Sequence, residues 1–159
     1  MINRKTTLHL ILLFSIFAVS AAYFIEYILG HQPCNLCLIE RIPYIVSIVI
    51  ILLSIFIQKF ERFFLIILSI TFIIAFVISF YHFGIEQGFI KESLVCDLNS
   101  NNTDLTKEAL LNQLKEVTVS CKDATFIILG LSLATINIFI SLIIATITIK
   151  LFLTYEKNK

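Results

Sequence analysis

The stretch FFLIILSITFIIAFVISFYHFGI, residues 63–85, decides the fold because it runs for 23 residues without Asp, Glu, Lys or Arg. At 1.5 Å per residue, a helix of this length crosses the hydrocarbon core of a bilayer, which is about 30 Å thick. Its apolar residues do not alternate with polar ones as in a strand, and backbone hydrogen bonding in lipid then requires a helix. We therefore predict a membrane-spanning helix here.

Three further uncharged runs have similar lengths of 20, 17 and 26 residues, at residues 6–25, 42–58 and 124–149. Hydrophobic residues make up 58% of the 159 positions and the mean hydropathy is +0.97, unlike a soluble domain. We predict an all-α membrane protein, a four-transmembrane-helix bundle that forms a single domain over residues 1–159. The expected helices are residues 7–29, 42–58, 62–83 and 124–150. The expected outer loops are residues 30–41 and 84–123.

The first uncharged run also has two features of a secretory signal, a basic start and small residues at Ser20–Ala22. Because apolar sequence continues through Ile25, we expect a retained spanning helix rather than a cleaved signal. Either outcome leaves the first two cysteines on the same side of the membrane.

The basic residues predict the orientation of the bundle. Seven of the twelve Lys and Arg lie at the termini or in the short turn at residues 58–62, where Glu61 and Glu156 are the acidic residues. The segments before the second and fourth runs hold the other five basic residues and nine acidic ones. By the positive-inside rule, both termini lie in the cytoplasm and the two longer loops face outward.

All four cysteines, Cys34, Cys37, Cys96 and Cys121, fall in the two outer loops. An even number of cysteines on an oxidising face is typical of disulfide chemistry. If a helix begins near Pro33, the first two cysteines share one face with Cβ atoms about 5–6 Å apart, which suits a disulfide. The partial positive charge of a helix N-terminus also favours their thiolate form.

Arg41 lies one helical turn beyond Cys37 and would share its face. Its guanidinium could stabilise a thiolate or donate hydrogen bonds to the oxygen of a bound ligand. Alternatively, it is an interfacial arginine that reaches toward water or pairs with Glu40. Pro43 either kinks this helix or marks the point at which it enters the membrane.

Cys96 and Cys121 admit two interpretations. A permanent disulfide would close a loop of about 25 residues and stabilise it by roughly 3 kcal/mol. A disulfide that exchanges with Cys34 and Cys37 would instead form an electron relay. Since no haem, iron–sulfur or flavin motif is present, a relay at the membrane surface points to a lipid-soluble acceptor such as a quinone. Between these cysteines, helical spacing predicts an amphipathic helix over residues 103–116.

Several other classes of site are disfavoured. A structural zinc site needs about four ligands in closely spaced pairs, and His31, His82, Cys96 and Cys121 are too dispersed, so we predict no metal. A c-type haem would require His after the second cysteine, where the chain has Leu38. Basic patches for nucleic acid and glycine-rich phosphate loops are absent from the sequence.

The motif PCNLCLIERIPY, residues 33–44, resembles the PCxLCxxxR pattern of the disulfide bond formation protein B (DsbB) family of bacterial inner-membrane oxidases. The segments EYILG, residues 26–30, and YHFGIEQG, residues 81–88, are similar to the shorter members of that family. The resemblance covers nearly the whole chain. It implies redox cysteines on the periplasmic face, ubiquinone or menaquinone as acceptor, and a DsbA-type thioredoxin-like partner.

The resemblance also implies a role for each cysteine. The reduced partner would attack Cys96, and Cys121 would then attack Cys34. Cys37, released as a thiolate, would lie against the quinone ring and pass on two electrons, while Arg41 would bind a quinone oxygen. The loop after Cys96 differs from that of the longer members, so the order of attack is less firmly implied than the pairing.

Three further polar residues have open roles. His82 falls near the region where the family places quinone contacts, but an ordinary interfacial histidine has the same position. Glu26 and Glu86 lie at predicted helix ends and are either interfacial residues or participants in proton or quinone binding.

We therefore predict a quinone-dependent thiol oxidase that regenerates the disulfide of a soluble periplasmic oxidant. One alternative is a vitamin K epoxide reductase-like enzyme, but in that class the CxxC pair comes late in the helix order. Another is a non-enzymatic carrier with disulfide-stapled loops. A carrier would need polar ligands within the membrane, and the runs offer almost none beyond His9.

Overall fold

The computed structural model describes residues 4–91, 96, 120–122, 127–128 and 130–157. Four of its helical spans are long and apolar enough to cross a membrane, which confirms the predicted all-α bundle of four spanning helices. The elements in chain order are α1 (Arg4–Tyr27), α2 (Asn35–Ile39), α3 (Ile42–Phe56), the 3₁₀ turn η1 (Gln58–Phe60), α4 (Glu61–Glu86), β1 (Ile127–Ile128), β2 (Leu131–Ser132) and α6 (Leu133–Lys157).

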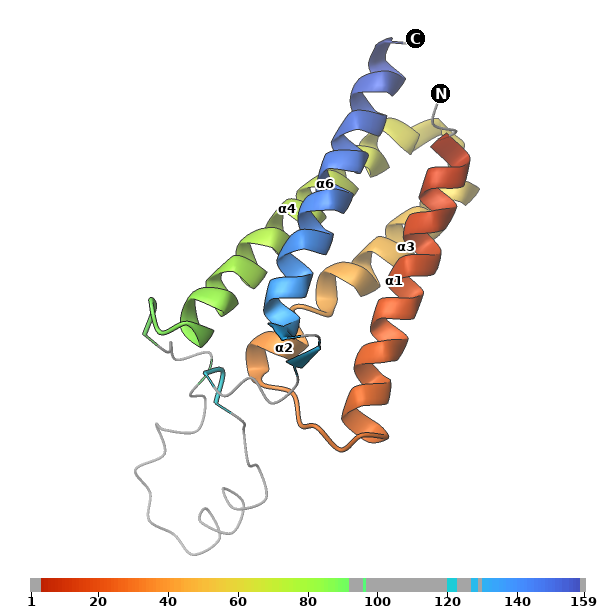
Figure 1. The fold of residues 1–159 in the computed structure, drawn as a ribbon. Helices are drawn as coiled ribbons and strands as arrows, with labels where there is room; N and C mark the ends of the chain where they lie inside the picture. Colours follow the sequence, from red (N-terminus) through yellow and green to blue (C-terminus); the bar gives the residue numbers. More distant parts are fainter. Residues whose placement is uncertain (1–3, 92–95, 97–119, 123–126, 129, 158–159) are drawn as a thin grey trace, which may run out of the picture.

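The long helices run beside one another, with both chain ends at one end of the bundle and α2 at the other (Figure 1). Helices α4 and α6 form the most extensive contact, and α3 packs against both α1 and α4. Helix α1 is therefore tied to the bundle mainly through α3. This arrangement leaves the space between α1 and α6 for the cavity described below.

The interior of the bundle combines large apolar side chains with small hydroxyl residues. Phe72 is fully buried and meets Tyr44 edge to face, with ring centroids 5.9 Å apart. Ser47 donates a hydrogen bond of 2.9 Å to Ser15 across the interface between α3 and α1. Small residues let membrane helices approach closely, and their hydroxyls find partners within the bundle.

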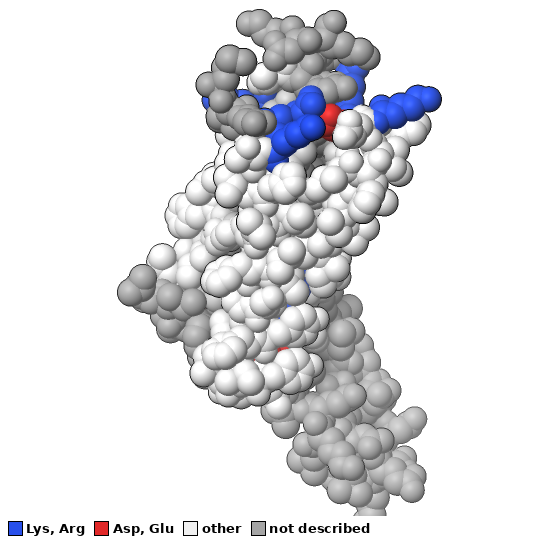
Figure 2. Space-filling model, turned by 90° about the vertical axis from the view of Figure 1, so that its right-hand side faces the viewer, with Lys and Arg blue, Asp and Glu red and all other residues white. Residues whose placement is uncertain are grey.

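The outer surface is suited to lipid. Figure 2 shows Lys and Arg gathered at one end of the molecule, above a broad face that is almost free of charge. The basic end contains the start of α1, the η1 turn and the end of α6, where Arg4, Lys59 and Lys150 lie. Large apolar side chains such as Phe17 and Val77 point outward from the long helices. The protein is therefore a multi-pass membrane protein.

The chain around the first cysteine pair forms a helix near Pro33, as predicted. Helix α2 begins at Asn35, and Cys34, the residue after Pro33, is its N-cap with φ −72° and ψ 166°. The Cys34 side chain accepts the hydrogen bond that caps the helix, so the cysteine takes the place of a capping serine. Pro43 lies in the first turn of α3, where a missing N–H is tolerated, so it starts a helix rather than kinking one.

The fourth long helix also starts later than predicted. The uncharged run suggested a helix over residues 124–150, but α6 begins at Leu133 and extends to Lys157. Before it, Ile127–Ile128 pairs antiparallel with Leu131–Ser132 around Gly130, whose φ of +82° favours glycine in the turn. The first three spanning helices differ from their predicted ranges only near the ends. The amphipathic helix predicted at 103–116 lies outside the described residues.

Candidate redox site

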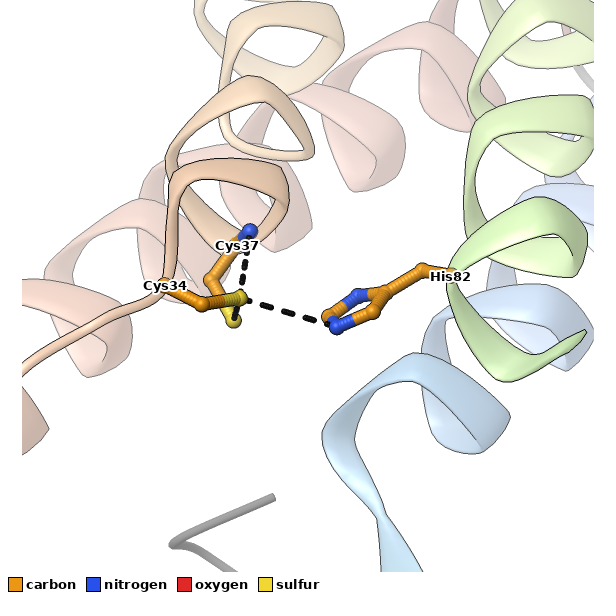
Figure 3. A group of neighbouring side chains, drawn as sticks. All are labelled: Cys34, Cys37 and His82. Atoms are coloured by element: carbon orange, nitrogen blue, oxygen red, sulfur yellow. Dashed lines mark hydrogen bonds between the residues drawn. The ribbon is translucent and has the colours of Figure 1, made fainter. Parts of the chain in front are cut away.

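The two cysteines of the CxxC pair are neighbouring free thiols at the start of α2. Their Sγ atoms are 2.6 Å apart, and Cys34 is more deeply buried than Cys37. Figure 3 shows both sulfurs facing His82, which comes from the far end of α4. A disulfide has an S–S distance of about 2.05 Å, so this pair can open and close with little movement of the backbone.

The surroundings of Cys34 favour its thiolate form. The hydrogen bond from Cys37 lowers the pKa of the Cys34 thiol from 9.0 to about 5; burial opposes this shift, while His82 adds to it through a hydrogen bond and its charge. The backbone N–H of Cys37 also donates to the Cys34 Sγ at 3.2 Å. In the reduced pair, Cys34 is therefore the thiolate at neutral pH and Cys37 the thiol that donates to it.

His82 joins the cysteine pair to a buried carboxylate. Its Nε2 lies 3.6 Å from the Cys34 Sγ, and its Nδ1 lies 2.9 Å from the Oε1 of Glu40. Glu40 comes from the junction between α2 and α3, one residue before Arg41. The arrangement of thiolate, imidazole and carboxylate fixes the orientation of the histidine ring and provides a path for a proton.

A polar network from α6 holds the Glu40 carboxylate in place. The Asn137 amide donates to the Oε2 of Glu40 at 3.1 Å and to the hydroxyl of Ser79 at 2.8 Å. The hydroxyl of Tyr44 donates to the Oδ1 of Asn137. This network was missed by the sequence analysis. Asn137, the one side-chain amide in a run of apolar and hydroxyl residues, was the signal that could have revealed it, because such a residue is costly unless its partners are present.

Arg41 pairs with a carboxylate other than the one expected. Its Nη1 lies 2.5 Å from the Oε2 of Glu26 on α1, and its guanidinium lies 5.2 Å from the ring centroid of Tyr23. The suggested pairing with the adjacent Glu40 is wrong, because that carboxylate binds His82. Glu26, whose role was open, therefore orients the arginine, and this bond connects α1 to the start of α3.

Glu86 connects α4 and α6 at the end of the bundle that holds the cysteines. Its Oε2 accepts a hydrogen bond of 2.5 Å from Ser132, and its Oε1 lies 3.9 Å from the Nε2 of His82. The hydroxyl of Ser132 also caps α6 by accepting from the backbone N–H of Thr135. Glu86 thus joins the end of α4 to the start of α6 beside the histidine.

The second cysteine pair lies against the first. Cys96 and Cys121 form a disulfide with their Cα atoms 5.8 Å apart. Both pack in one buried cluster with Cys34, Leu36 and Ile85. The sequence predicted that all four cysteines lie on one face of the membrane, and the structure brings the two pairs into contact.

A cavity of about 340 Å³ lies beside the cysteines. Its walls are mainly apolar side chains of α1 and α6, including Phe17, Ile25, Ile136 and Ile140. Five of the six predicted site residues line it, and Cys96 does not: the five are Cys34, Cys37, Arg41, His82 and Cys121. Glu40, Glu86 and Asn137 add further polar groups to the lining. An apolar cavity with a few convergent polar groups is a common form of binding site for small organic molecules.

The fold and the site define a multi-pass membrane protein with one disulfide and one pair of neighbouring thiols in contact. The family model of the disulfide bond formation protein DsbB matches residues 4–151, so the chain belongs to this family, as the motif suggested. It is therefore a membrane disulfide oxidoreductase.

A relative from Rickettsia prowazekii (strain Madrid E), described as an uncharacterized protein, is 31% identical over 162 residues. The match covers 98% of this chain and 92% of the relative. The similarity therefore extends over nearly the whole chain rather than one segment. No solved structure matches the chain.

Proposed function

We propose that this protein is a quinone-dependent oxidase that regenerates the disulfide of a DsbA-type, thioredoxin-like dithiol protein. The observation that carries the proposal is the burial of Cys121 and Cys34 in one cluster, with Cys34 and Cys37 also lining the apolar cavity. Electrons can then pass from the loop pair to the CxxC pair and onward to an acceptor in the cavity. Membership of the DsbB family favours this function over the vitamin K epoxide reductase-like and carrier alternatives.

The proposed relay consists of balanced thiol–disulfide exchanges. A thiolate of the reduced partner attacks Cys96 and releases Cys121, which attacks Cys34 and releases Cys37 as a thiolate. The second thiol of the partner then attacks the mixed disulfide between the partner and Cys96. This releases Cys96 as a thiolate and leaves the partner with its own disulfide. Cys96 next attacks Cys121, which restores the loop disulfide and leaves Cys34 and Cys37 reduced.

The cysteines of the structure correspond to this last state, with the loop pair bonded and the CxxC pair reduced. The Cys34 thiolate accepts a hydrogen bond from the Cys37 thiol, so one proton must leave the pair before its disulfide can form. His82, whose charge stabilises the thiolate, can pass its own proton to the acceptor and take up the Cys37 proton in its place, and Glu40 orients its ring. Closing the pair releases two electrons.

The cavity fits a quinone as the acceptor of these electrons. A bound quinone supplies a two-electron sink and leaves as the quinol after taking up two protons. The apolar walls from α1 and α6 suit a flat ring with an isoprenoid chain, and Arg41 and His82 offer nitrogen donors for its oxygens. Glu26 holds the guanidinium of Arg41 at the cavity wall, so this donor is in place before the ligand arrives.

In the proposed orientation, the basic end that carries both termini lies in the cytoplasm and the cysteines face the periplasm of a bacterial inner membrane. Support comes from the gathering of Lys and Arg at that end (Figure 2). The single membrane domain would then present Cys96 and Cys121 to the soluble partner.

The direct test uses purified protein in detergent with ubiquinone or menaquinone and a reduced thioredoxin-like dithiol protein. We expect the quinone to be reduced as the dithiol is oxidised, with one quinone consumed per disulfide formed. The Cys37→Ser variant should lose turnover by at least about a thousandfold, since its CxxC pair cannot close. Full activity in this variant would overturn the mechanism.

A matched variant separates the relay from the quinone step. Cys96→Ser/Cys121→Ser should stop oxidising the protein partner but should still oxidise dithiothreitol, which reaches the CxxC pair without the loop. If this double variant oxidises the protein partner at the normal rate, the loop pair has no part in the relay.

A further inference from the structure

Two cysteines and one histidine at this site form a group with the composition of a metal centre. The Sγ atoms of Cys34 and Cys37 and a ring nitrogen of His82 all lie within 4.8 Å of one another. In Figure 3 these side chains converge from the start of α2 and from α4. We propose that the reduced Cys34–Cys37 pair and His82 bind one thiophilic divalent cation, with Zn²⁺ as the fitting example.

One of the three ligand separations already matches a tetrahedral site. With Zn–S near 2.3 Å and Zn–N near 2.0 Å, the sulfur and nitrogen ligands lie about 3.6 Å apart and two sulfurs about 3.8 Å apart. The separation of the Cys34 Sγ from the Nε2 of His82 is 3.6 Å already. The two sulfurs, now 2.6 Å apart, must separate by about 1 Å. Cys37 is only partly buried and borders the cavity, so its side chain has room to rotate.

The histidine is oriented as a metal ligand. Metal-binding histidines commonly donate their second ring N–H to a carboxylate, which fixes the tautomer and strengthens the ligand nitrogen. Glu40 occupies this position, with its Oε1 2.9 Å from the Nδ1 of His82. Asn137 holds the other oxygen of the same carboxylate. When the Nε2 proton leaves, the Nδ1–H still donates to Glu40 and the neutral ring presents the lone pair of Nε2 to a cation held by the two sulfurs.

Charge and coordination number favour an exchangeable ion over a closed structural site. Two thiolates neutralise a divalent cation, which lowers the cost of holding it in a buried position. Three protein ligands leave a fourth position for water, as in catalytic zinc sites. The cavity of about 340 Å³ borders both sulfurs and can supply that water. The sequence predicted no metal because its possible ligands do not occur in closely spaced pairs: His82 lies 48 positions after Cys34.

Binding requires the reduced pair. A cation takes both sulfurs as thiolates and displaces two protons, one from the remaining thiol and one from Nε2 of His82, with no change in oxidation state. A disulfide offers no thiolate ligand, so metal and disulfide exclude each other at this position. The proposal goes beyond the proposed function: it predicts an oxidase whose CxxC pair is blocked reversibly by zinc, but the binding itself needs no quinone and no partner protein.

The test is a titration of the full chain in detergent with Co²⁺, a spectroscopic probe for Zn²⁺ sites, without quinone or partner. The protein carries Cys96→Ser/Cys121→Ser, so that a reductant exposes the CxxC thiols alone. Wild-type protein with its loop disulfide intact is titrated in parallel, which guards against misfolding of the double variant. We expect one Co²⁺ per chain, a thiolate-to-cobalt charge-transfer band, and displacement of Co²⁺ by Zn²⁺.

Substitutions of the ligand His82 and of Glu40, which orients it, should lower the affinity for Co²⁺ by different amounts. His82→Ala should weaken binding at least about tenfold, and Glu40→Gln should weaken it about tenfold to a hundredfold while keeping one Co²⁺ per chain. His9→Ala is the matched control, because His9 lies on α1 with its Nδ1 bonded to the Lys5 carbonyl. It should bind Co²⁺ as the parent does, and protein with an oxidised CxxC pair should bind none.

Three outcomes would overturn the metal site: no binding by the reduced protein, equal binding by the oxidised protein, or binding that is unchanged in His82→Ala. None of them bears on quinone reduction, which the oxidase assay measures separately. Failure of the metal site and failure of the proposed function are therefore distinguishable.

Discussion

The two halves of the bundle are built on different physical principles. The half near the chain termini is held by buried apolar side chains such as Leu65, Leu68 and Phe72. The other half buries His82 and Glu40 beside the cysteines and satisfies them with one another and with Asn137. Buried ionisable groups are expensive in a membrane and are weak contributors to stability. The first half therefore stabilises the fold, and this offsets the free-energy cost of the buried ionisable groups in the second half.

Phe72→Ala should produce the largest effect and should act on stability. The side chain is fully buried between helices, so its removal leaves a cavity and costs about 3–5 kcal/mol. Thermal unfolding in detergent would measure the loss. The activity of the protein that remains folded should fall much less than in His82→Ala, because Phe72 reaches the site only through its contact with Tyr44. A large fall in activity per folded molecule would show that the two halves are not separable in this way.

His82→Ala should produce the opposite pattern. Removing the imidazole that carries protons beside Cys34 should lower quinone reduction by about a hundredfold, the usual contribution of an acid or base group. The unfolding temperature should change much less than in Phe72→Ala, because one buried ionisable group is lost. His9→Ala, on the exposed part of α1, should leave both quantities unchanged. Equal effects of the two histidine variants on activity would contradict the assignment.

The reactive half should also respond to pH in a distinctive way. Because the pKa of Cys34 is lowered from 9.0 to about 5, the thiolate is present throughout pH 6–8 and is lost only as the pH falls through about 5. Alkylation of Cys34 by iodoacetamide should therefore change less than about twofold between pH 6 and 8. An ordinary thiol with a pKa of 9.0 would react about a hundredfold faster at pH 8 than at pH 6.

The alkylation experiment has an internal control. Reduced Cys96→Ser/Cys121→Ser protein isolates the CxxC pair, and mass spectrometry locates the label. Cys37→Ala removes the hydrogen bond that lowers the pKa most, so its profile should shift toward that of an ordinary thiol. An unchanged flat profile in Cys37→Ala would show that another group stabilises the thiolate.

Glu26→Gln should have the smallest effect. The substitution removes the charge that holds Arg41 but keeps a side chain of the same shape. We expect the KM for quinone to rise about threefold to tenfold with little change in kcat, which corresponds to about 1 kcal/mol of binding. Steady-state kinetics with varied quinone would measure it. A change confined to kcat would place Glu26 in the chemistry rather than in the positioning of Arg41.

Much of the fold could be predicted because membrane insertion depends on local composition. The run at residues 63–85 became the body of α4, and the spacing of Cys34 and Cys37 correctly placed them side by side. The start of α6 could not be predicted in the same way. Composition does not distinguish a helix from a short hairpin, and the turn at Gly130 decided between them.

The sequence by itself determined the four spanning helices, the motif and the chemistry of its cysteines, since these depend on neighbours along the chain. Only the tertiary structure decided which carboxylate each cation meets: Glu26 for Arg41 and Glu40 for His82. These contacts join different helices, and a small rotation of one helix about its axis would exchange their partners. The rotation is set by packing along the whole length of the bundle.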